Sequence, residues 1–354
     1  MNMYRCCSSR FVVSYPTAAA DHPNPSPKKG EGLMNDLPFF GPSPFFKGRG
    51  WGGVFLNHST VQSMNPIRLL FLFCFLCFSA LSFAAKVDTL DIPSAVMQKN
   101  LRAAVVLPNS YAKGNATYPV LYLLHGGGGQ FSDWLKQTPD KMLVHKLADQ
   151  YNIIIVMPEG EKLSGYLDSP FQKDNQFETY ITKEVVGKID NTYRTIRDRK
   201  GRVITGLSMG GHGALYLSTR HPELYCAAGS MSGAVDLNRK KWKIDAEFAK
   251  RITPEFERIL GPENATPDLH AANSVINMVD KMKTNGLKII IDCGVDDFLI
   301  EPNRELHHRL VYNNTPHEYT ERPGAHTWDY WENSLPSHVL FFSKVLKQNG
   351  IVVP

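Results

Sequence analysis

Residues 203–216, which read V-I-T-G-L-S-M-G-G-H-G-A-L-Y, constrain the fold more than any other stretch of the chain. An apolar run leads into Gly206–Gly210, which matches the pattern G-x-S-x-G. A serine in a tight turn between a strand and a helix has a strained backbone, so the residues two before and two after it need to lack side chains. The pattern therefore predicts a strand, a sharp turn at Ser208 and a helix that begins near Met209.

This pattern is short, and a chain with 27 glycines can match it by chance. Its surroundings favour a functional serine, because a strand-like run precedes it and small residues follow it at Gly210, Gly211, Gly213 and Ala214. The strand would carry Ser208 to the carboxyl edge of a sheet, and the helix would point its N-terminal amides at a reacting oxygen.

The composition is that of a globular protein, with 43% hydrophobic and 21% charged residues in 354. This length suits one large domain or two small ones. The formal charge of +5 is concentrated near the N-terminus, since residues 85–354 hold 32 lysines and arginines against 31 aspartates and glutamates. Such a balance excludes a basic nucleic-acid-binding surface of the usual kind.

Residues 64–84 have the organisation of a secretory signal peptide. Met64–Arg68 is a short positive start, Leu69–Phe78 is unbroken apolar sequence, and Ser82–Ala84 is a small-x-small cleavage site. The alternative is a membrane anchor, but an apolar core of about 15 residues is short for a span. We therefore expect cleavage near Ala84 and export, periplasmic or extracellular, of a mature chain without a stable membrane span.

The first 63 residues are rich in proline, glycine and serine and lack periodicity. We interpret them as lying outside the fold, either disordered or the product of a start codon placed too far upstream. Of the six cysteines, only Cys226 and Cys293 follow the leader, each on a predicted core strand. This count excludes a disulfide framework and predicts two buried free thiols.

Apolar runs alternate with segments of helical periodicity through the rest of the chain. The predicted strands are 87–92, 101–107, 119–124, 152–157, 203–206, 224–230, 287–292 and 317–321, and the main predicted helices are 139–150, 177–189, 301–312 and 328–347. This alternation predicts one α/β domain over residues 85–354, with a mostly parallel sheet covered by helices on both faces. Residues 234–283 are charged and locally helical, and we expect this insertion to form a cap over the site.

A serine hydroxyl is a poor nucleophile at neutral pH, so Ser208 needs a base, and the base needs an acid to orient it. In this type of fold the acid and then the histidine follow the serine along the chain. Three carboxylates compete after the strand at 287–292: Asp292, Asp296 and Asp297. Asp292 is still on the strand and is expected to be structural, whereas Asp297 lies three residues beyond Gly294 and has room to turn back. Asp297 is the preferred acid.

The base must come from twelve histidines. His307, His308 and His338 fall within predicted helices, and His317 begins a strand. His326 stands in P-G-A-H, in the loop after the last strand, from which an imidazole could reach Ser208. His326 is therefore the predicted base.

A serine nucleophile that attacks a carbonyl group also requires hydrogen-bond donors for the oxyanion of the tetrahedral intermediate. One predicted donor is the backbone N–H of Met209, and the other comes from the loop His125–Gly129. A glycine-rich run can instead bind phosphate, but no Gly-Lys-Ser/Thr follows, so a P-loop is excluded.

Five motifs together carry a family resemblance: L-L-H-G-G-G-G followed by Trp134, Y-L-D-S-P, G-L-S-M-G-G-H-G-A-L, D-C-G-V-D-D-F-L and P-G-A-H-T-W. Across residues 86–350 the chain resembles the esterase D-like family of α/β-hydrolases. That family includes S-formylglutathione hydrolases, tributyrin-type, feruloyl and acetyl-xylan esterases, and mycolyltransferases. The resemblance implies the α/β-hydrolase fold, a triad of Ser208, Asp297 and His326, and the Gly127 amide as second oxyanion donor. The export signal departs from the cytosolic formylglutathione enzymes, and residues 234–283 match no substrate class.

Four further residues are candidates for substrate binding: Trp134, Tyr166, Asp168 and Trp328. The two tryptophans could flank the cleft and the Y-L-D-S-P loop could line it, but core packing and an ordered loop explain these residues equally well. His125 and His212 are expected to be hydrogen-bonded parts of the scaffold.

The sequence thus predicts an exported serine esterase that needs no metal or cofactor and forms an acyl-enzyme intermediate. Its expected substrate is a small-molecule or polysaccharide-linked carboxylic ester. The alternatives are an acyltransferase to a sugar hydroxyl, which uses the same triad, and a non-catalytic carbohydrate-binding protein on the same fold.

Overall fold

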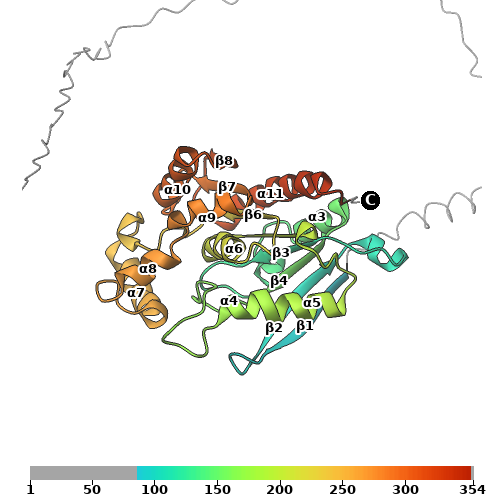
Figure 1. Ribbon diagram of the computed structural model, residues 1–354, viewed down its shortest axis with the longest axis horizontal. Helices are drawn as coiled ribbons and strands as arrows, with labels where there is room; N and C mark the ends of the chain where they lie inside the picture. The colour runs from blue at the N-terminus through green and yellow to red at the C-terminus, as the bar shows by residue number, and fades with distance from the viewer. Residues whose placement is uncertain (1–85, 352–354) are drawn as a thin grey trace, which may run out of the picture. The chain divides into compact units, whose positions relative to one another are not determined.

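Residues 86–351 are described by a computed structural model in which eight strands form one sheet (Figure 1). The strands are β1 (Lys86–Ser94), β2 (Lys99–Leu107), β3 (Val120–Leu124), β4 (Ile154–Pro158), β5 (Arg202–Gly206), β6 (Ala227–Met231), β7 (Lys288–Gly294) and β8 (His317–Arg322). Their order in the sheet is β1-β2-β4-β3-β5-β6-β7-β8. β1 and β2 pair antiparallel with each other, β2 is also antiparallel to β4, and every later pairing is parallel.

Helices cover both faces of this sheet, as the alternating sequence pattern predicts. The longer ones are α3 (Leu143–Tyr151), α5 (Val186–Thr192), α6 (Met209–Arg220), α7 (Ala246–Leu260), α8 (Pro267–Asn273), α9 (Val279–Thr284), α10 (Ile300–Tyr312) and α11 (Trp328–Gln348). The short elements are η1 (Asn109–Lys113), α2 (Asp133–Lys136), α4 (Phe177–Thr179), η2 (Tyr180–Val185), η3 (Arg199–Gly201), η4 (Arg239–Lys241) and η5 (Val275–Asn277). α3 and α11 pack together on one face, and α5, α6 and α10 lie on the other.

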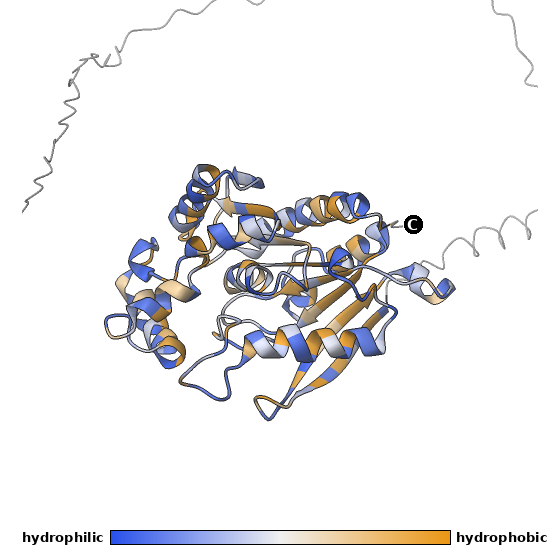
Figure 2. Cartoon of the chain, viewed as in Figure 1, coloured by the Kyte–Doolittle hydropathy of each residue, from blue (hydrophilic) through white to orange (hydrophobic). Residues whose placement is uncertain are grey.

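The core is divided by the sheet into two apolar layers. In β3, Val120, Tyr122 and Leu124 face the layer that contains α5 and α6, whereas Leu121 and Leu123 face the layer that contains α3 and α11. Because both faces are buried, the central strands are apolar throughout rather than alternating, as Figure 2 shows. This is the α/β-hydrolase architecture, with the carboxyl ends of the parallel strands at one edge.

Two elements begin three or four residues later than predicted. The helix predicted from residue 139 begins at Leu143, because Asp140 accepts a hydrogen bond from the Met142 N–H and fixes a turn there. The strand predicted from residue 224 begins at Ala227, because the Leu224 N–H donates to His221 and continues the turn after α6.

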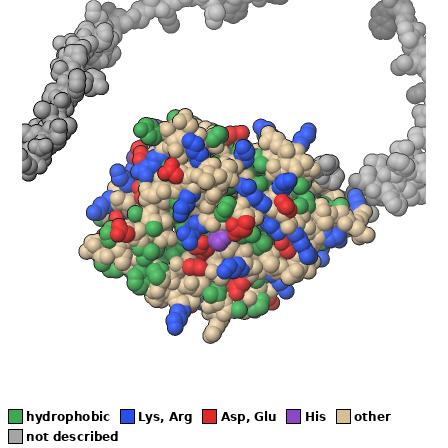
Figure 3. Space-filling model, in the orientation of Figure 1, with side chains coloured by type: hydrophobic (Ala, Val, Ile, Leu, Met, Phe, Trp, Pro, Cys, Tyr) green, Lys and Arg blue, Asp and Glu red, His purple; other side chains and the backbone are tan. Residues whose placement is uncertain are grey.

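Residues 234–283 form the expected helical insertion, with η4, α7, α8, η5 and α9 between β6 and β7. No helix within residues 86–351 has the length and apolarity needed to cross a membrane. On the face seen in Figure 3, side chains of both charge signs are interspersed, in keeping with the near-zero balance of this part of the chain. The predicted leader, residues 1–63, and the predicted signal peptide, residues 64–84, lie outside the described residues.

Candidate active site

Ser208 occupies the predicted turn between β5 and α6. Its backbone has φ 55° and ψ −116°, a conformation that costs a non-glycine residue about 1–3 kcal/mol. Hydrogen bonds hold the turn, since the Ser208 N–H donates to Met231 and the Ser208 carbonyl accepts from the Ala234 N–H. The serine side chain therefore stands at the carboxyl edge of the sheet, beside the first turn of α6.

The two glycines of the motif are required by close backbone contacts. A Cβ on Gly206 would lie 2.6 Å from the backbone carbon of Gly210. A Cβ on Gly210 would lie 2.6 Å from the carbonyl oxygen of His125 and 2.7 Å from that of Leu124. Since backbone cannot move aside as a flexible side chain can, larger residues here would separate α6 from β3 and displace Ser208.

Ser208, His326 and Asp297 lie in one hydrogen-bonded line, with the geometry predicted from the sequence. Nε2 of His326 is 2.9 Å from Oγ of Ser208, and Nδ1 is 2.8 Å from Oδ2 of Asp297. The Asp297 side chain is buried, and its Oδ1 also accepts a hydrogen bond from the Leu299 N–H at 2.8 Å. A carboxylate fixed in this way holds a proton on Nδ1, which leaves Nε2 free to accept the serine proton.

Close packing of two loops brings the acid and the histidine together. Gly294 ends β7, and a Cβ on it would lie 2.2 Å from the carbonyl oxygen of Gly324, two residues before His326. The Asp297 N–H donates to Gly294, which turns this carboxylate inward, while Asp296 is exposed and donates its N–H to Gly324. The structure therefore brings Asp297, and not Asp296, to the imidazole.

Asp292 has the structural position expected for it. It lies on β7, is buried, and pairs with the guanidinium of Arg322. Burial raises the pKa of Asp292 to about 6, although hydrogen bonds from Ser334 and Arg322 oppose this shift.

Two aromatic rings that sequence reasoning did not single out hold the imidazole. The Phe298 ring centroid is 4.4 Å from that of His326, and Trp331 contacts the same imidazole edge-on at 4.8 Å. Nε1 of Trp331 donates to Oγ of Ser232 at 3.2 Å, which fixes the indole. Phe298 directly follows Asp297, and Trp331 lies five residues after His326, in the first turn of α11. Their closeness in sequence to two predicted triad residues is the one feature from which sequence reasoning could have identified them.

The two amides predicted to bind the oxyanion have no acceptor within residues 86–351. No hydrogen bond is made by the N–H of Gly127 or of Met209, whereas the neighbouring Gly128 and Gly129 amides donate to backbone carbonyls. His125 holds this loop, since its Nε2 accepts from the Gly160 N–H at 2.9 Å and its Nδ1 contacts the Gly126 carbonyl at 2.9 Å. The expected scaffold role of His125 is thus confirmed.

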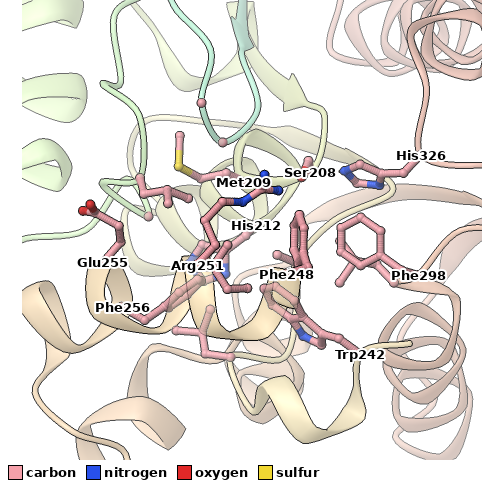
Figure 4. A pocket seen from close by; sticks show the side chains of 18 of the residues that line it. Ser208, Met209, His212, Trp242, Phe248, Arg251, Glu255, Phe256, Phe298 and His326 are labelled. Carbon is pink, nitrogen blue, oxygen red and sulfur yellow. Dashed lines mark hydrogen bonds between the residues drawn. The ribbon is translucent and has the colours of Figure 1, made fainter. Parts of the chain in front are cut away.

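Cavities open on both sides of Ser208. The larger, of about 940 Å³, is lined mainly by apolar side chains, and α7 of the insertion supplies much of its wall (Figure 4). Its principal lining residues are Met209, Leu237, Trp242, Phe248, Ile252, Phe256, Ile259, Phe298 and Leu299. The smaller, of about 300 Å³, is lined by the glycine loop with Asp133, Gln137, Trp328 and Trp331. The insertion therefore shapes the site as a cap would.

Of the four substrate-binding candidates, Trp328 alone lines either of these cavities. Trp134 is buried against Trp328 and donates its Nε1–H to the Leu124 carbonyl, so it is a core residue. Tyr166 is fully buried and its hydroxyl donates to the His125 carbonyl, and Asp168 accepts from the N–H and hydroxyl of Thr179. For these three residues the substrate-binding hypothesis was wrong, because each side chain is used within the scaffold.

Within residues 86–351, no three histidine, cysteine, aspartate or glutamate side chains are arranged to hold a metal ion. Cys226 and Cys293 are buried free thiols, as predicted. Burial raises the pKa of Cys226 to about 11 and that of Cys293 further, which keeps both thiols protonated at neutral pH.

Comparisons with known proteins agree with this fold. The family model described as "Putative esterase" matches residues 94–342. The acetyl esterase of Caldicellulosiruptor saccharolyticus is 26% identical over 267 residues, which cover 71% of this chain and 96% of that protein.

Two further relatives extend the similarity. The diacylglycerol acyltransferase/mycolyltransferase Ag85A of Mycobacterium tuberculosis is 31% identical over 281 residues, covering 70% of this chain and 78% of that protein. A solved structure of a ferulic acid esterase superposes with a TM-score of 0.62 at 29% identity, covering 75% of this chain and all of that one. The chain therefore belongs to the esterase family, in the esterase D-like group of α/β-hydrolases, and is a serine esterase that hydrolyses carboxylic esters.

Proposed function

We propose that this esterase acts through a triad in which Ser208 is the nucleophile, His326 the general base and Asp297 the orienting acid. The observation that carries the proposal is the continuous line of hydrogen bonds from Ser208 Oγ through both ring nitrogens of His326 to Asp297. Nε2 takes the serine proton as Oγ attacks the ester carbonyl, then gives it to the departing alcohol. Water, activated by the same nitrogen, hydrolyses the acyl-enzyme and releases the acid.

Labelling with a fluorophosphonate tests this assignment directly. The probe should modify Ser208 in the wild-type protein and give no label in Ser208→Ala. A Ser343→Ala variant, which changes a partly exposed serine near the C-terminal end of α11 and outside both cavities, should label like the wild type. Labelling that persists in Ser208→Ala would assign the nucleophile to another serine.

The N–H groups of Gly127 and Met209 are proposed to bind the oxyanion, because both are free of other hydrogen bonds beside Ser208. Gly127→Pro deletes one donor and is expected to lower kcat by about 10² to 10³-fold. Gly127→Ala should cost less, because its Cβ would meet only the end of the flexible Leu163 side chain, at 2.9 Å. Steady-state kinetics on p-nitrophenyl acetate measure both, and near-wild-type turnover in a folded Gly127→Pro enzyme would move the donor elsewhere.

The proposed substrate is an ester whose acyl group is attached to a sugar or polysaccharide. Support comes from similarity to an acetyl esterase and a ferulic acid esterase, and from the smaller cavity, where Trp328 lies near the polar side chains of Asp133 and Gln137. An indole face and nearby hydrogen-bonding groups suit a sugar ring. Rates on acetylated xylan and methyl ferulate, compared with those on p-nitrophenyl esters, test this substrate class.

Transfer of the acyl group to a sugar hydroxyl is the second candidate, because the 31% identical relative carries the name of an acyltransferase. Both reactions share the acyl-enzyme and differ in whether water or a sugar attacks it. Adding a sugar acceptor to the hydrolysis assay, with chromatography of the products, separates them. An acylated sugar formed in excess over free acid would identify a transferase.

Export is also part of the proposal, and it rests on the organisation of residues 64–84. The mature chain is expected to begin near Ala85, as determined by mass spectrometry of the protein recovered from the exported fraction. An N-terminus upstream of Met64 in that fraction would contradict the prediction. A chain of residues 86–354 is expected to fold and retain activity, since both core layers lie within it.

A further inference from the structure

The wall of the larger cavity is apolar except for a few charged and polar side chains, one of which is Arg251. Arg251 lies on α7, and Figure 4 shows its side chain extending into the cavity toward the side that holds Ser208 and Met209. Its guanidinium lies over the Phe248 ring, 4.9 Å from the centroid. Stacking on an aromatic face holds an arginine in place while leaving its N–H groups available.

This cation has no anionic partner within residues 86–351. No carboxylate of that part of the chain lies within ion-pair distance of Arg251, although α7 carries acidic residues. Glu255, one turn further along, pairs instead with Arg258 at 3.3 Å and points away from Arg251 in Figure 4. The guanidinium therefore enters the cavity with its charge uncompensated.

The remaining charges at the cavity do not cancel it. Lys162 and Asp296 both line the rim, both are exposed, and neither makes an ion pair within the described residues. Glu255 is paired with Arg258, so the unpaired charges at this cavity are those of Arg251, Lys162 and Asp296. Two are positive and one is negative, which leaves an excess of one positive charge. The cavity is thus suited to a substrate that brings one negative charge.

A second polar group lies in the same cavity. His212 is on α6, four residues after Ser208, and is only 1% exposed. Its ring stacks on Tyr216, and neither of its ring nitrogens makes a hydrogen bond of good geometry within residues 86–351, so the hydrogen-bonded scaffold role expected from the sequence is wrong for this imidazole. Burial lowers its pKa to about 4, a shift that the backbone of Ala234 opposes only in part. A neutral imidazole keeps one N–H donor, so this side chain also suits a polar group on the substrate.

A series of aromatic rings connects Arg251 to the imidazole of His326. Phe248 packs on Phe298 with centroids 5.6 Å apart, and Phe298 packs on His326 at 4.4 Å. The Trp242 ring also packs on Phe298, with centroids 6.0 Å apart. An acyl group on Ser208 that lies along these rings would contact Phe298 and then Phe248, over which the Arg251 guanidinium lies.

We propose that the larger cavity binds an acyl group with an apolar body and a terminal carboxylate, and that Arg251 is the residue that selects it. The substrate class is then a monoester of a dicarboxylic acid, and the inference rests on the proposed role of Ser208. Arginine matches a carboxylate with two parallel N–H donors, which gives selectivity over a neutral chain of equal length. Hydrolysis breaks the acyl carbon–oxygen bond, so water and the monoester give the free diacid and the alcohol.

The test compares two esters of equal chain length, p-nitrophenyl adipate (the free-acid monoester) and p-nitrophenyl hexanoate. Arg251→Gln is expected to lower kcat/KM for the adipate by about fivefold and to leave the hexanoate within about twofold, as for a partly exposed ion pair. Arg251→Glu should lower the adipate rate further. Lys250→Gln is the matched control, because it removes the same charge from the adjacent position of α7, which is exposed like Arg251 but does not line the cavity. Raising the ionic strength should reduce the adipate preference of the wild type.

Equal losses on both esters, or the same change in Lys250→Gln as in Arg251→Gln, would overturn the inference. The hexanoyl ester of 4-hydroxybenzoate carries its carboxylate on the alcohol instead of the acyl group. If Arg251→Gln lowered kcat/KM for this ester alone, the carboxylate would belong to the alcohol and the acyl assignment would be overturned. Calorimetric binding of both p-nitrophenyl esters to Ser208→Ala gives a readout without turnover. Tighter binding of the adipate than of the hexanoate, lost in Ser208→Ala/Arg251→Gln, would support the role of Arg251 separately from the assignment of the nucleophile, whereas equal binding of the two esters to Ser208→Ala would overturn it.

Discussion

Ser208→Ala is expected to lower kcat for p-nitrophenyl acetate by about a million-fold, the largest effect of any single substitution in this chain. Without Oγ, His326 has no nucleophile to activate and no acyl-enzyme can form. His326→Ala should lose nearly as much, because an unassisted hydroxyl remains protonated at neutral pH. The double variant is expected to lose little more than either single one, since the two groups perform one proton transfer together.

Stopped-flow and long-incubation assays at saturating substrate measure these rates, with thermal unfolding of each variant as the control for structure. Both substitutions shorten side chains at the surface of the cleft, so unfolding temperatures should stay close to that of the wild type. Ser343→Ala should keep full activity. Losses that multiply in the double variant would show that Ser208 and His326 act independently, and this result would refute the triad.

The sequence predicts the sheet and the hydrogen-bonded line of Ser208, His326 and Asp297 well, because both depend on local patterns. Apolar runs such as 120–124 are buried on both sides of a parallel sheet, and the glycines around Ser208 report a turn that few other sequences allow. Chain order then places the acid and the base on loops at the same edge of the sheet. Asp297 was preferred over Asp296 because it had room to turn back, and the hydrogen bond from its N–H to Gly294 makes that turn.

The residues that line the cleft could not be predicted in the same way, because the sequence does not show whether an aromatic side chain is enclosed by the scaffold or faces the cleft. Tyr166 looks like a pocket residue in Y-L-D-S-P, yet Gly160 and Gly213 have no side chains and leave space that its ring fills. Trp134 is similarly enclosed, by Trp328.

Residues that do line the cleft come from segments far apart in the chain. Phe248, Ile252, Phe256 and Ile259 recur at helical spacing on α7, so an apolar face was readable there. Its partners Trp242 and Phe298 are separated by more than fifty positions and meet only in the folded chain. Periodicity shows that one face of a helix is apolar, but it does not show which cavity that face lines.

Asp297→Asn carries the second large prediction, and its neighbour provides a matched control. In the wild type, Oδ1 of Asp297 accepts from the Leu299 N–H while Oδ2 lies 2.8 Å from Nδ1 of His326. An asparagine that keeps the Leu299 bond through its oxygen must turn its NH₂ toward the imidazole. That donor favours the tautomer with its proton on Nε2, which cannot accept a proton from Ser208.

We therefore expect Asp297→Asn to lower kcat by about 10³ to 10⁴-fold, and Asp296→Asn to change it by less than about threefold, as for an exposed surface residue. Steady-state kinetics on p-nitrophenyl acetate measure both variants, and the rate of fluorophosphonate labelling of Ser208 should fall in Asp297→Asn alone. Because Asp297 is buried, the unfolding temperature of the Asp297→Asn variant must be measured too, so that a folded but slow enzyme is distinguished from an unfolded one. Equal losses in the two variants would leave Asp297 a structural residue, and a larger loss in Asp296→Asn would make Asp296 the acid. The prediction depends on one feature of the fold, the turn at Gly294 that directs one of two adjacent carboxylates to the histidine and the other to solvent.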